Sequence, residues 1–181
     1  MTEEASRGRW TLDADAVRQL GAAVLTAQMF ETLFVLVARS ALKWPLARDF
    51  DEIAPFGKQA FKQPVAALVK ELSSASQIDP DLADRVNAWV ENRHALVHRH
   101  LLENVEKSDA EYWETMKALS KLVFTESAEL CGVFIALFMP YLAKMSQTEQ
   151  WTHDNSDSIS AFVRYAEGVR ASLRTSGQGH G

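Results

Sequence analysis

Four residues in the middle of the chain, Arg93, His94, His98 and His100, are of the types that act on phosphates and protons. Arginine offers a rigid fork of donors that fits a phosphate and the extra charge that a phosphate gains in a transition state. Histidine can accept or donate a proton near neutral pH. Such a pair could cleave RNA without a metal ion, by activating the ribose 2′-hydroxyl against the adjacent phosphate.

The spacing of these residues indicates how they could cooperate on a helix. Arg93 and His98 are five residues apart, which places them roughly 140° apart around an α-helix. Both could then reach one ligand only across a groove. Arg93 and His100 are seven residues apart and nearly superimpose two turns along. Either histidine could therefore act with the arginine at an interface.

Arg93 also falls on an otherwise apolar helical stripe, seven residues after Val86. A long ionisable side chain on such a stripe either has a partner or faces a functional surface. Glu31, which lies inside an apolar stretch, and Asp84 are candidate partners. The stripe leaves two readings open for Arg93, a ligand-binding group and a half-buried structural ion pair.

The element that carries these residues is predicted to be a helix opened by Asp79 and Pro80. Aspartate supplies an N-cap oxygen, and proline at the next position has its φ already set for a helix. The apolar stripe predicted for this helix comprises Leu82, Val86, Trp89, Val90, Val97 and Leu101.

Apolar residues that recur every three or four positions predict four more helices. These cover Asp13 to Leu42, Val65 to Leu72, Ser108 toward Pro140, and Asp157 to Leu173. Pro140 is expected to kink or divide the last turns of the fourth helix. Trp44 to Lys62 reads as an ordered loop or a short turn of helix. The predicted fold is all-α, an antiparallel bundle of four to five helices.

The length of 181 residues, with 47% hydrophobic and 24% charged residues, fits one compact domain. We expect a flexible N-terminus over residues 1–12, a single helical domain over 13–173 and a disordered tail over 174–181. The formal charge of −5 argues against a protein that grips duplex nucleic acid mainly through its phosphates. Any contact with nucleic acid should therefore be local.

Several features favour a cytoplasmic protein that does not cross a membrane. The single cysteine, Cys131, cannot form an internal disulfide and is expected to be an inert core residue. The acidic, polar start of the chain does not resemble a secretion signal. The longest charge-free apolar run, Leu130 to Ala143, is shorter than the roughly 20 residues of a membrane span.

The segment Arg93 to His98 resembles the signature of the HEPN superfamily, which is an arginine, then Asn, Asp or His, then three residues, then histidine. The resemblance implies a small helical bundle that forms a homodimer with two motifs facing one cleft. Many such proteins are metal-independent endoribonucleases, including toxins of toxin–antitoxin and phage-defence systems. An antitoxin or a nucleotidyltransferase is a partner that the family association suggests.

Carried over by this resemblance, Arg93 would hold the phosphate and His98 would be the general acid or base. His94, where the toxins most often have asparagine, would orient them. His100 and Glu31 are secondary candidates, and no cofactor is expected. The alternative is a non-catalytic regulatory or interaction module in which Arg93 forms a structural ion pair. A metal-binding bundle is the weakest reading, because a di-iron site needs two E-x-x-H steps and the chain offers one, Glu91 with His94.

Overall fold

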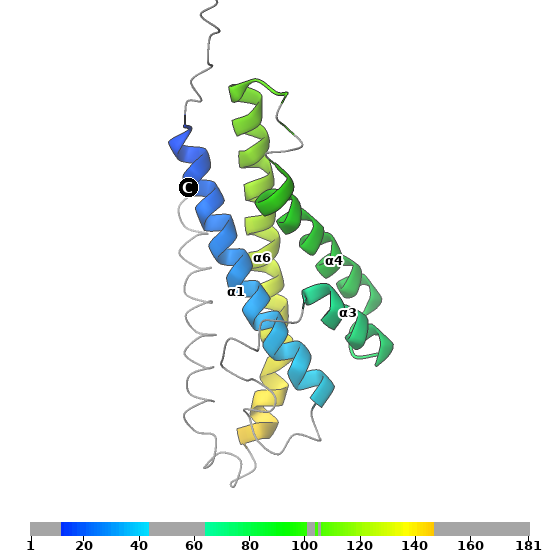
Figure 1. Cartoon of the computed structure of the whole chain (residues 1–181). Helices are drawn as coiled ribbons and strands as arrows, with labels where there is room; N and C mark the ends of the chain where they lie inside the picture. The colour runs from blue at the N-terminus through cyan, green and yellow to red at the C-terminus, as the bar shows by residue number, and fades with distance from the viewer. Residues whose placement is uncertain (1–11, 44–63, 101–103, 105, 147–181) are drawn as a thin grey trace, which may run out of the picture.

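The computed structural model describes residues 12–43, 64–100, 104 and 106–146, and these are almost entirely helical (Figure 1). The helices are α1 (Ala14–Lys43), α3 (Val65–Ser74), α4 (Pro80–His94) and α6 (Asp109–Ser146). A π-helical segment, η1 (Ala95–Arg99), follows α4 directly. The all-α class is therefore confirmed. The fifth helix predicted over 157–173, the predicted tail over 174–181, residues 1–11 of the predicted flexible N-terminus and the 44–62 loop lie outside the described residues.

Three helices begin with side-chain caps, of which the sequence analysis predicted the one at Asp79. The Asp13 carboxylate accepts from backbone N–H groups in the first turn of α1. Asp79 does the same for α4, with Pro80 at the first helical position. At α6, Ser108 donates its hydroxyl to Glu111 at 2.8 Å, and its backbone N–H donates to the same carboxylate at 3.2 Å. These contacts satisfy amide groups that have no partner within the helix.

α1 and α6 lie parallel, and α4 runs antiparallel to both (Figure 1). Asp13 at the start of α1 pairs with Lys117 near the start of α6 at 2.8 Å. Farther along the same two helices, Phe30 contacts Phe134. α4 runs the opposite way. Arg85, near the start of α4, pairs with Glu126 and Glu129, which lie about half-way along α6. The antiparallel arrangement predicted for the bundle thus applies to α4, whereas α1 and α6 share one direction.

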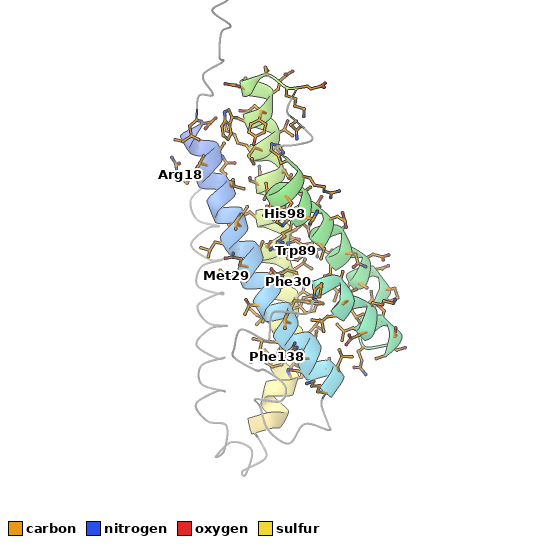
Figure 2. The ribbon with its side chains drawn as sticks, viewed as in Figure 1. Arg18, Met29, Phe30, Trp89, His98 and Phe138 are labelled. Atoms are coloured by element: carbon orange, nitrogen blue, oxygen red, sulfur yellow. The ribbon has the colours of Figure 1, made fainter. Side chains whose placement is uncertain are left out.

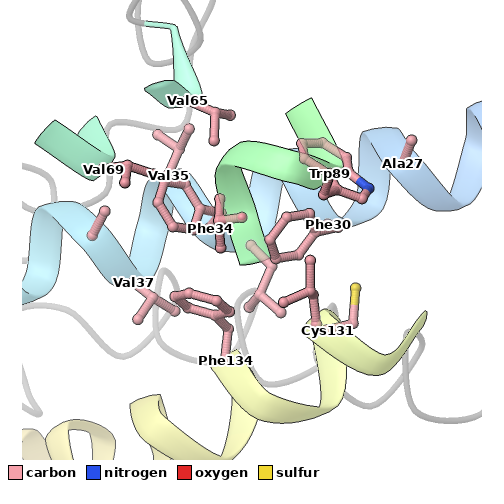
Figure 3. Packing of buried hydrophobic residues seen from close by; sticks show 14 of the residues in the cluster. Ala27, Phe30, Phe34, Val35, Val37, Val65, Val69, Trp89, Cys131 and Phe134 are labelled. Atoms are coloured by element: carbon pink, nitrogen blue, oxygen red, sulfur yellow. The ribbon is translucent and has the colours of Figure 1, made fainter. Parts of the chain in front are cut away.

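Aromatic side chains from three helices meet at the centre of the core (Figure 3). The Phe30 ring packs edge-on against Trp89 with centroids 4.6 Å apart, and the Phe34 ring packs against Phe134 at 5.0 Å. These four side chains are at most 2% exposed. The position of Trp89 on the predicted apolar stripe is thereby confirmed. Each such ring pair adds about 0.5–1.5 kcal/mol beyond its area of burial.

One detail of the predicted apolar stripe is wrong, and one of the two effects predicted for Pro140 is excluded. Val97 is 41% exposed, whereas Leu96, which the predicted stripe omitted, is 4% exposed. Leu96 lies seven residues after the buried Trp89 and hence on the same helical face, while Val97 lies about 100° farther round. α6 also continues through Pro140 to Ser146, so the proline does not divide it, and a kink at Pro140 stays a prediction. A proline inside a helix removes one backbone hydrogen bond, and the remaining bonds of α6 maintain the helix.

By length and composition alone, two described segments could cross a membrane, α1 and residues Asp109–Pro140 of α6. The most apolar windows of these segments are 44% and 39% buried inside the protein. Core helices of soluble proteins pass the same criteria, so these two segments are weak evidence for a membrane span. The absence of a membrane span stays a prediction.

Candidate functional site

Arg93 lies in the last turn of α4 and reaches across to α1. Its guanidinium donates to the Glu31 carboxylate at 3.4 Å, which confirms Glu31 as the partner suggested by the sequence. The two side chains are 30% and 35% exposed, so the pair is accessible to solvent. A long, solvent-accessible contact of this kind contributes less than about 1 kcal/mol to stability. A stronger anion could therefore compete with Glu31 for the arginine at little cost.

This ion pair borders a small cavity of about 140 Å³ between α1, α3 and α4. Arg93, His94 and Glu31 line its polar side. The remaining lining comes from Pro64, Val65, Ala66, Trp89 and Val90. Two of the predicted catalytic residues, Arg93 and His94, and the secondary candidate Glu31 therefore meet in one concave site.

His98 lies next to this cavity without lining it. The rings of His94 and His98 are in contact, with centroids 4.9 Å apart and planes inclined at 50°. Both histidines are exposed. Figure 2 shows His98 beyond Trp89 along the continuous helix formed by α4 and η1. Within one chain, Arg93 and His94 thus line the cavity, and His98 contacts it only through the ring of His94.

The π-helical segment η1 changes the geometry that the sequence predicts for these residues. The backbone N–H of His100 donates to the carbonyl of Ala95, five residues earlier. A turn closed between residues five apart is wider than an α-turn, so residues five apart stack more nearly above one another. Arg93 and His98 are consequently closer in angle than the α-helical estimate. Single π-turns occur frequently at functional sites.

His100 occupies a different environment and is 3% exposed. Its Nδ1 lies 3.3 Å from the Asn104 amide nitrogen, which also donates to the His100 carbonyl at 2.7 Å. Its ring packs on Tyr112 of α6 with centroids 4.8 Å apart, and burial raises the pKa of that tyrosine. The structure therefore places His100 in the interior, whereas His94 and His98 are accessible to a substrate.

Trp89, one turn before Arg93, is fixed by a hydrogen-bond chain that sequence reasoning missed. Its indole N–H donates to the Ser127 hydroxyl of α6 at 2.8 Å, and Ser127 donates to the Val123 carbonyl at 2.6 Å. These bonds tie the cavity wall to α6. A serine within a long apolar helix gives no sequence signal of such a role.

The described residues offer no group of three or more His, Cys, Asp and Glu side chains that could hold a metal ion. Glu91, the acid of the single E-x-x-H step, pairs instead with Arg99 at 3.0 Å. None of the family models, curated proteins or solved structures compared with the chain matches it.

Proposed function

We propose that this chain is a HEPN-like, metal-independent endoribonuclease that acts as a homodimer, with Arg93 and His98 as its catalytic residues. The observation that carries the proposal is the group formed by the half-buried Arg93 and the exposed His94 and His98 at a small cavity. The motif resemblance gives these three residues their roles. Because the ion pair between Glu31 and Arg93 is weak, the guanidinium is available to a phosphate.

In the proposed reaction, His98 removes the proton of a ribose 2′-hydroxyl, and the 2′-oxygen forms a bond to the adjacent phosphorus. The bond from phosphorus to the 5′-oxygen breaks, and a protonated histidine delivers a proton to that oxygen. The products are a 2′,3′-cyclic phosphate and a 5′-hydroxyl. Arg93 neutralises the charge that accumulates on the phosphoryl oxygens during the step.

The proposed homodimer addresses the separation of Arg93 and His98 within one chain. A two-fold interface brings the same patch of both subunits together. If η1 lies at this interface, the second copy adds another arginine and another pair of histidines to the cleft. One histidine can then act as the base while the other protonates the leaving group.

The test is cleavage of single-stranded RNA by the purified chain in EDTA. Arg93→Ala and His98→Ala should each lower the rate by at least about a hundredfold, because one removes charge stabilisation and the other proton transfer. Arg18→Ala is the matched control, since Arg18 is an exposed arginine of α1 whose side chain is 77% accessible. Full activity in both site variants would contradict the proposal.

A second candidate is a non-catalytic interaction module, and the Arg93–Glu31 contact between α4 and α1 favours it. In that case Arg93 positions α4 against α1, and antitoxin or nucleotidyltransferase partners bind at a surface other than the cavity. Wild-type protein would then leave RNA intact in EDTA. Arg93→Ala would lower the melting temperature or dissociate the dimer, both of which scattering and thermal unfolding can measure.

A further inference from the structure

The exposed pair of His94 and His98 has a geometry that suits a metal ion. Imidazole nitrogens bind Zn²⁺ at about 2.0–2.1 Å, which places each ring centroid about 3.2 Å from the ion. Two rings around a tetrahedral ion are then about 5 Å apart between centroids. The observed separation is 4.9 Å.

We propose that His94 and His98 form a two-histidine site for a borderline divalent transition ion such as Zn²⁺, and that the ion blocks the site. The binding part of the proposal rests on the exposure of the two rings and on their separation of 4.9 Å. Inhibition rests on the proposed ribonuclease function, because a nitrogen of His98 that donates its lone pair to a metal cannot accept a proton. Water would fill the remaining positions around the ion.

The surroundings of the pair fit an inhibitory ion better than a structural one. Structural zinc sites have four protein ligands, and the described residues near the pair supply two. Glu91, one turn before His94, pairs with Arg99 at 3.0 Å. Both histidines are exposed, so an ion can reach them from solvent and a chelator can remove it.

The experiment is calorimetric titration of Zn²⁺ into the full-length, metal-free chain. One ion should bind per chain, and His94→Ala and His98→Ala should each weaken binding by at least about a hundredfold, since the second ring binds as part of a chelate. His153→Ala, which removes a histidine distant in sequence, is the matched control. Binding that survives both site variants, or disappears in the control, would overturn the site.

A second measurement separates this inference from the proposed function. Zn²⁺ should inhibit RNA cleavage by the wild-type chain, and excess EDTA should restore the full rate. Zinc binding without any RNA cleavage would refute the ribonuclease and leave the site. RNA cleavage that is indifferent to Zn²⁺ at saturating concentration would refute the inhibition and leave the ribonuclease.

Discussion

Trp89 belongs both to the core and to the candidate site, and each of its contacts can be tested by one substitution. Its ring packs against Phe30, and its indole N–H is bonded to Ser127. It also lines the cavity beside Arg93. Because Trp89 is 2% exposed, the position of α4 depends on a buried polar contact as well as on apolar packing.

Replacing Ser127 with alanine should destabilise the protein by about 1–3 kcal/mol, because the buried indole N–H loses its acceptor. Thermal or urea unfolding measures the change. Ser120→Ala is the matched control on the same helix, since Ser120 is also fully buried but its hydroxyl has no hydrogen-bond partner among the described residues. Equal destabilisation of the two variants would show that the Trp89 contact contributes little.

Cys131 is fully buried, as predicted, and burial raises the pKa of its thiol to about 12. The thiol therefore stays neutral in the folded chain, while in the unfolded chain it ionises near its ordinary pKa of 9.0. Its contribution to stability is complete below pH 9 and should be lost as the pH rises toward 12. Urea unfolding across this range should show the loss, and Cys131→Ala should flatten that part of the pH profile. An unchanged profile would contradict it.

At the scale of helices, caps and apolar repeats gave the correct starts for α1, α4 and α6. These signals are local, since a cap needs one side chain near its own first turn. The π-turn at η1, the burial of Leu96 and the Ser127 contact could not be predicted. They depend on which face of α4 meets α6, and that choice involves residues distant in sequence. Glu31 could be named as one of two candidate partners for Arg93, because it is an acid inside an apolar stretch, but the choice between Glu31 and Asp84 needed the structure.

Asp79→Ala should lower the stability of the chain by about 0.5–2 kcal/mol, because two amide groups of α4 lose their acceptor. Asp79→Asn keeps an accepting oxygen and should retain most of the stability. Circular dichroism during thermal unfolding distinguishes the two variants. A larger loss for asparagine than for alanine would contradict the capping role.

At the scale of the whole molecule, the proposed homodimer needs a surface near the motif that a second copy can cover. Val97 in η1 is an apolar side chain, 41% exposed, next to His98. A two-fold contact through this segment would cover it and bring the two motifs together. The chain therefore offers a surface position where charge should disturb assembly without disturbing the core.

The wild-type chain should show twice the 20.2 kDa mass of one chain in light scattering. Val97→Asp should reduce this mass to that of a monomer and lower any RNA cleavage with it, because an unpaired charge in an interface is unfavourable. Leu25→Asp, on an exposed position of α1, is the control and should leave the mass unchanged. A dimer that tolerates Val97→Asp would place the interface elsewhere.

The parallel pairing of α1 and α6 has a consequence for how the chain folds. Phe30 and Phe134 meet in the core although about 100 residues separate them along the chain, and closing so long a loop has an entropic cost before the contact forms. α3 and α4, which are neighbours in sequence and in space, have no such delay. α6, the main packing partner of α1, is the last of the described helices to be synthesised. The apolar face that α1 packs on α6 is therefore exposed on the ribosome until most of the chain has emerged.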